Sequence, residues 1–151
     1  MRAVTTTVCP LTRAAATVIG IAGWSVVAVG GGAALGAWMR WGLGMLLNPV
    51  FPTIPLGTLA ANVVGGFLMG IVMALLAHFE AMPSELRLLM TTGFLGGLTT
   101  FSTFSAETVT LLSRGQHEWA VALILAHVVG SVAATVLGLL LAGALLSGGL
   151  R

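Results

Sequence analysis

Charged residues are scarce in this chain of 151 residues: they make up 7% of the sequence, and lysine, aspartate and tyrosine are absent. A soluble domain normally carries about 25% charged residues, which keep its surface in water. Six arginines and four glutamates cannot cover a globule of this size. With a hydrophobic fraction of 58%, the composition predicts an integral membrane protein.

The lack of charge clusters and of cysteine excludes several kinds of site and partner. The arginines are scattered singly along the chain, so they form no basic patch of the kind that nucleic acid requires. A single cysteine, Cys9, excludes an internal disulfide and a multi-cysteine metal site. Nucleophile elbows, paired carboxylates and phosphate-binding loops are missing from the sequence. We therefore predict neither an enzyme nor a nucleic-acid partner.

Four apolar segments are long enough to cross a bilayer, which needs about 20 residues. Prolines and short polar stretches separate them. The predicted spans are about Trp24–Leu46, Leu56–Phe79, Ser84–Leu112 and Glu118–Leu146. We interpret residues 14–147 as one all-α, four-helix transmembrane domain, with short tails at 1–13 and 148–151 and with both termini on one side of the membrane.

The third segment contains a stretch, Gly93–Ser105, that is a poor continuous helix. Three glycines weaken it, and its Thr and Ser side chains offer the backbone competing hydrogen bonds. In hydrocarbon, irregular backbone persists only against protein or along a water-filled path. The sequence therefore predicts a third helix broken near its middle, beside a polar site.

Small and polar residues recur every four positions in the other three segments. Small residues at this spacing allow close helix approach, and several such faces also favour a second subunit. Asn62 reads slightly more readily as interhelical packing than as a site, whereas Arg40 is expected to reach the headgroups, to attract anions, or both. The His127 row fits a lined pathway and packing equally well. The rows are Gly32, Gly36 and Arg40; Asn62, Gly66 and Gly70; Gly130, Ala134 and Gly138; and His127, Ser131 and Thr135.

Phe101 and Phe104 share one face of the helix after the break. Such pairs usually pack, but a phenyl ring has a positive edge that can meet an anion. Glu107 is an intramembrane carboxylate near a helix end. These patterns alone indicate a small oligomeric channel or transporter. The weak arginine bias between the two sides would permit insertion in both orientations and hence an antiparallel dimer.

Four motifs together resemble the bacterial fluoride-channel family known as Fluc or CrcB. They occur in the family's order and cover about Gly30 to Leu146, and the third is the most specific. The motifs are Gly30–Arg40 (GGGAALGAWMR), Ile54–Gly65 (IPLGTLAANVVG), Thr91–Glu107 (TTGFLGGLTTFSTFSAE) and Gly130-Ser131.

The resemblance implies a passive, fluoride-selective channel in the inner membrane of the cell. Members of the family are antiparallel, dual-topology homodimers with two pores along the subunit interface. Fluoride that entered an acidified cell as HF would leave through these pores, without ATP or a coupled ion. The competing function is a small, dual-topology, proton-coupled multidrug transporter, which needs a central acidic residue.

The resemblance also implies roles for particular residues. Carbonyls of Gly96 and Thr99 would hold a structural sodium ion, Na⁺, that is not transported. Phe101, Phe104 and Asn62 would meet fluoride in the pore, and Ser131 and Thr135 would continue a polar track. Arg40 would lie in the vestibule, and Glu107 matches the acid that follows the aromatic motif.

The chain departs from the family pattern in three places. Leu95 replaces a common Cys, and His127 stands where Asn or Tyr is more familiar. A histidine at this position would make conduction sensitive to pH. The segment before Gly30 is longer than usual. The arginine distribution also leaves open a heterodimer of two oppositely oriented paralogues.

Overall fold

A computed structural model describes residues 10–148, with side-chain burial from residue 23 onward. This part of the chain is entirely helical. α1 begins at Pro10 and therefore takes in the last four residues of the predicted tail, whereas residues 1–9 and 149–151 lie outside the described part. The elements are α1 (Pro10–Leu47), η1 (Asn48–Val50), α2 (Leu56–His78), α3 (Ser84–Leu88), η2 (Leu89–Leu95), α4 (Gly96–Leu98), α5 (Phe101–Ser113) and α6 (His117–Gly148).

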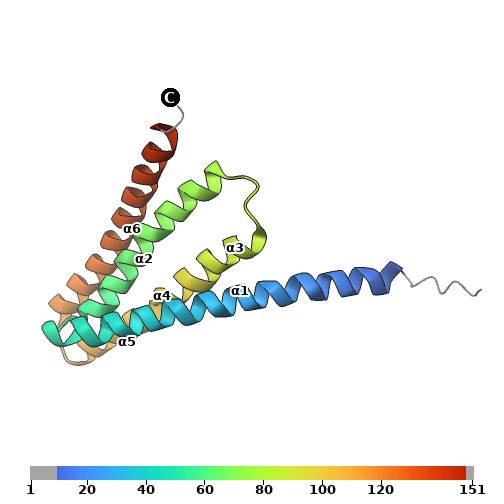
Figure 1. Ribbon diagram of the computed structural model, residues 1–151. Coiled ribbons are helices and arrows are strands. Elements are labelled where there is room, and N and C mark those ends of the chain that lie inside the picture. The colour runs from blue at the N-terminus through green and yellow to red at the C-terminus, as the bar shows by residue number, and fades with distance from the viewer. Residues whose placement is uncertain (1–9, 149–151) are drawn as a thin grey trace, which may run out of the picture.

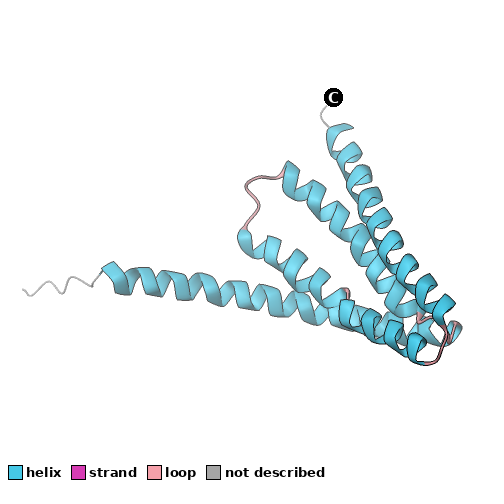
Figure 2. Ribbon diagram, turned by 180° about the vertical axis from the view of Figure 1, so that it is seen from behind, coloured by secondary structure: helices cyan, strands magenta, loops and turns pink. Residues whose placement is uncertain are grey.

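The helices form two packed pairs that meet at one end of the molecule and splay apart at the other (Figures 1 and 2). α2 lies along α6, and α1 lies along the segment made of α3, η2 and α4. α5 continues beyond the break to the end where the two pairs meet, and there it contacts α6. The broken third segment thus also contacts α2 and, through α5, α6.

Glycines allow the two helices of each pair to pack closely against each other. A Cβ at Gly36 of α1 would overlap the carbonyl oxygen of Phe94, and one at Gly70 of α2 would overlap that of Thr135. In the opposite direction, a Cβ at Gly138 of α6 would overlap the carbonyl oxygen of Phe67. The small-residue rows in these helices thus serve helix packing, as their spacing predicts.

Gly70→Ala is expected to destabilise the fold by about 1–3 kcal/mol, because the added methyl group has no space against backbone that cannot move aside. The matched control is Gly42→Ala, also in a helix, where a Cβ would meet nothing within 4 Å. There the change is expected to be neutral, or stabilising by up to about 1 kcal/mol. Thermal unfolding in detergent measures both variants. Equal midpoints for Gly70→Ala and Gly42→Ala would contradict this packing.

Two described helices, α2 and α6, are long and apolar enough to cross a membrane unbroken. The third predicted span is divided among shorter helices and therefore does not meet that criterion as one helix. Large apolar side chains on α6, such as Leu125, Val129 and Val132, are exposed in the single chain. An apolar surface of this extent needs lipid or another subunit to cover it.

The third segment is irregular over a longer stretch than the break alone. A π-helical turn, η2, precedes three residues of α-helix, and Thr99 and Thr100 then adopt extended backbone angles. Helix resumes at Phe101, with the Thr100 side chain accepting a hydrogen bond from the Thr103 N–H at 3.2 Å as its N-cap. The break therefore falls at Thr99-Thr100, inside the predicted Gly93–Ser105 stretch.

Candidate functional site

Asn62 holds the two sides of the break together from the neighbouring helix α2. Its Oδ1 accepts from the Thr100 N–H at 2.8 Å, and its Nδ2 donates to the Thr100 carbonyl oxygen at 3.1 Å. Thr100 is 6% exposed, so without Asn62 its backbone N–H would lack a partner away from water. Its carbonyl, as the N-cap of α5, also accepts the first bond of that helix, so the Asn62 amide adds a second donor to it.

The carbonyl groups of residues 96–99 lose their helical donors at the break. For two of them, the new partner of the donor is defined: in a continuous helix, the N–H groups of Thr100 and Thr103 would donate to the carbonyls of Gly96 and Thr99. Here the Thr100 N–H donates to Asn62, and the Thr103 N–H donates to the Thr100 side chain. The carbonyl oxygens of Gly96 and Thr99 are thereby released, and Gly96 lies on an exposed face of the single chain.

His127 of α6 contacts Asn62 as well, beside the pair of hydrogen bonds between Asn62 and Thr100 that we call the clamp. Its Nδ1 lies 3.0 Å from Asn62 Nδ2, and its ring lies 4.7 Å from the Phe104 ring, centroid to centroid, at 32°. His127 is 4% exposed, and its Nε2 has no hydrogen-bond partner in the described part of the chain. The histidine therefore joins α6 to both the amide of α2 and the aromatic pair of α5.

Phe101 and Phe104 differ strongly in burial. Their ring centroids lie 5.5 Å apart at 60°, so the rings are tilted and not stacked. Phe104 packs against the core cluster that includes Leu111 and Leu123. Phe101 is 79% exposed and extends away from that core. One ring is thus fixed by the fold, and the other is left at the surface of the single chain.

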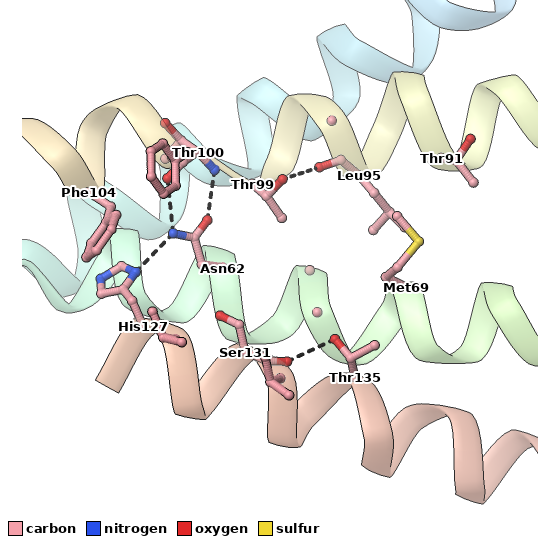
Figure 3. A pocket seen from close by; sticks show the side chains of 16 residues that line it. Asn62, Met69, Thr91, Leu95, Thr99, Thr100, Phe104, His127, Ser131 and Thr135 are labelled. Atoms are coloured by element: carbon pink, nitrogen blue, oxygen red, sulfur yellow. Dashed lines mark hydrogen bonds between the residues drawn. The ribbon is translucent and has the colours of Figure 1, made fainter. Parts of the chain in front are cut away.

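A pocket of about 480 Å³ opens between α2, α6 and the broken segment (Figure 3). It brings together seven of the eight predicted site residues, from four separate elements and the break between them. No side chain that lines it is an Asp, Glu, Lys or Arg. Those seven residues are Asn62, Gly96, Thr99, Phe101, Phe104, Ser131 and Thr135, and His127 lines the same space.

Arg40 is the predicted site residue that the structure places elsewhere. It lines a second pocket of about 490 Å³, together with Trp41, Asn48 and Thr58. Thr100 borders both pockets, so the break separates the two spaces. Glu107 lies near the second space, where its Oε1 accepts from the Thr58 hydroxyl at 2.6 Å. The single guanidinium at this site is thus held apart from the aromatic pair.

Sequence patterns did not single out Thr100 or Thr58. Thr100 caps α5, meets Asn62 through its backbone and borders both pockets, while Thr58 binds Glu107. The sequence does contain a local signal for the start of a helix at Thr100. This threonine follows a glycine run and stands three residues before another polar residue. The Thr58–Glu107 pair joins residues 49 positions apart, so no local spacing would have revealed it.

Comparison with known proteins identifies the family of the chain. Residues 27–139 match the model of the CrcB-like protein family, Camphor Resistance (CrcB). A fluoride-specific ion channel FluC from Nitrosospira multiformis is 58% identical over 117 residues, 78% of this chain and 91% of the relative. Those from Thiobacillus denitrificans (58%, covering 74% of this chain and 90% of the relative) and Ralstonia pickettii (53%, covering 78% and 94%) are similar. This chain belongs to the CrcB family of membrane proteins.

Proposed function

We propose that this protein is a passive, fluoride-selective channel that exports fluoride across the inner membrane. The observation that carries the proposal is the pocket in which two phenyl rings, an amide and several hydroxyl-bearing residues converge without an Asp, Glu, Lys or Arg side chain. The relatives' name, fluoride-specific ion channel FluC, supports the same function.

The pocket's chemistry suits a small, strongly hydrated anion that must both enter and leave. Ring edges of Phe101 and Phe104 carry partial positive charge. Ser131 and Thr135 line one wall, where the Thr135 hydroxyl donates to the Ser131 carbonyl oxygen at 2.9 Å. A lysine or arginine in the same place would bind the anion too tightly for rapid release. Arg40, in the separate second space, would attract anions toward the protein without holding them in the pore.

We further propose that two copies assemble antiparallel, with dual topology, and that each copy crosses the membrane four times. Phe101 and Gly96 are exposed in the single chain although they belong to the site, which is what an interface through this face requires. The exposed apolar side chains of α6 would then face the partner or lipid. Crosslinking in liposomes distinguishes this homodimer from a heterodimer of paralogues, since the homodimer forms from one purified chain.

A sodium ion at the dimer centre completes the proposal. The released carbonyls of Gly96 and Thr99 are neutral, hard oxygen donors, which suit a hard cation. Among the described residues, no cluster of three or more His, Cys, Asp or Glu could hold a metal instead. When bound, sodium would join the two subunits electrostatically and would not be transported.

Exchange of sodium for a bulky organic cation such as N-methyl-D-glucamine is expected to reduce fluoride flux at least about tenfold or to dissociate the dimer, because the paired carbonyls would then repel one another. Flux and size-exclusion profile are measured in the two cations at equal ionic strength. Full activity of an intact dimer without sodium would remove the site from the proposal.

Efflux from liposomes that contain the purified protein tests the channel function itself. A fluoride electrode should record rapid release that needs no ATP or proton gradient, with chloride nearly excluded. Comparable chloride flux would overturn the proposal. The alternative, a proton-coupled multidrug transporter, predicts proton release on addition of a hydrophobic cation. It has no support in the comparisons, and no acidic side chain lines the pocket described here.

A further inference from the structure

Both N–H groups of the Asn62 amide are used within the chain. An amide nitrogen carries two hydrogens, and here one faces the Thr100 carbonyl while the other faces His127 Nδ1. Its Oδ1 accepts from the Thr100 N–H. The amide that was expected to donate to fluoride therefore has no hydrogen left for an anion while His127 stays in place.

The backbone of Thr100 also fixes which way the amide points. Turning the Asn62 side chain over would place Nδ2 against the Thr100 N–H and Oδ1 against the Thr100 carbonyl, two repulsive pairs. The nitrogen must therefore face His127, and Nδ1 of His127 must be the acceptor. It follows that the neutral histidine carries its proton on Nε2.

We propose that His127 is a positioning residue that competes with the permeating anion for the second N–H of Asn62. An imidazole with an unprotonated Nδ1 occupies this N–H. An imidazolium, with a proton on both nitrogens, cannot accept from it and leaves it free for an anion in the pocket. The inference rests on the proposed fluoride function and assigns to this chain a control that its own histidine introduces.

Few other charges act on His127. The elements against it are α2, which offers the neutral Asn62, and α5, where the Phe104 ring is followed one turn later by Glu107. Glu107 is held by the Thr58 hydroxyl at 2.6 Å. On α6 itself the nearest titratable groups along the chain are His117 and Glu118, at the start of the helix. Arg40 borders the second pocket, on the other side of Thr100.

Two substitutions test separately the role of His127 as a hydrogen-bond acceptor and the role of its titration. His127→Phe keeps a ring against Phe104 but removes the acceptor. His127→Asn places an acceptor oxygen where Nδ1 stands and cannot titrate. Fluoride current is recorded in planar bilayers between about pH 8 and about pH 5.5, a range that brackets the ordinary histidine titration. Current is the appropriate measurement because neutral HF, which crosses lipid unaided, carries none.

The wild-type fluoride current is expected to rise as pH falls. His127→Phe should give a current roughly threefold to tenfold above wild type at the alkaline end and flat with pH, the scale of one ordinary hydrogen bond. His127→Asn should stay low and flat. The matched control, His117→Phe, changes an exposed histidine of the same helix and should behave as wild type. A His127→Phe current at or below wild type at the alkaline end overturns the proposal.

A measurement on the wild-type protein covers the case in which the His127→Phe variant does not assemble. In protein with ¹⁵N-labelled histidine, the ring nitrogens of His127 should show the Nε2–H form at neutral pH, assigned by loss of the signal in His127→Asn. An Nδ1–H form overturns the inference even if fluoride is conducted. A wild-type protein that shows the Nε2–H form but carries no fluoride current would instead overturn the proposed function.

Discussion

Replacing Phe101 by isoleucine is expected to lower fluoride flux about tenfold or more, the rate equivalent of about 1.4 kcal/mol or more lost along the anion's path. Isoleucine preserves an apolar side chain but has no polarised ring edge. Phe101 is 79% exposed and its ring contact within the chain is the tilted one with Phe104, so the fold should not change. Liposome efflux and the size-exclusion profile measure the two effects separately.

The burial of the other phenylalanines decides a second substitution, Phe104→Ile, and the control, Phe79→Ile. Phe104→Ile should lower flux similarly but also cost about 1 kcal/mol of stability, because Phe104 packs on the core cluster and on His127. Phe79→Ile removes an exposed ring outside the pocket and should leave flux unchanged. Wild-type flux in Phe101→Ile would mean that this ring serves only to pack against a partner or lipid.

Asn62→Leu is expected to have the largest combined effect, on both stability and flux. It leaves the buried Thr100 N–H without a partner, at about 1–3 kcal/mol, and removes one of the two donors to the Thr100 carbonyl, at about 1 kcal/mol. The break would then lose its defined shape, and with it the released carbonyls of Gly96 and Thr99. We expect at least about 2 kcal/mol of destabilisation, measured by thermal unfolding in detergent, and no detectable fluoride flux.

Asn48→Leu is the matched control for Asn62→Leu. Asn48 is also a half-buried asparagine, but it makes one bond of this kind, from the Gly57 N–H to its Oδ1 at 2.8 Å. Its replacement should cost about 1 kcal/mol. If Asn62→Leu were no more destabilising than Asn48→Leu, the clamp at the break would have no special energetic role.

The break could be predicted from the sequence, but its position could not. Glycines and hydroxyl-bearing residues weaken every part of Gly93–Ser105, so local preference distributes the weakness over the stretch. Two interactions select Thr99-Thr100: the local cap from Thr100 to Thr103, and the amide of Asn62, which lies 38 residues earlier. Only the first has a local signature, and the π-helical turn before the break has none.

The sequence predicted which residues line the pocket better than it predicted how they contact one another. Seven residues from four segments converge on one pocket, because the family motifs carry positions that fold together. Arg40 lies apart since α1 packs against the other face of the broken segment. The pairing of Asn62 with His127 escaped prediction, because the His127 row fits packing and a pathway equally well by spacing alone.

The clamp also has a consequence for how the protein is made. Since the Asn62 amide that pairs with the Thr100 N–H belongs to α2, this N–H has a partner only after α2 is in the membrane. Synthesis from the N-terminus meets this condition, because α2 leaves the ribosome first. A circular permutation that put the third segment ahead of α2 would send an unpaired peptide group into lipid, and we expect it to insert poorly although every contact of the finished protein is preserved.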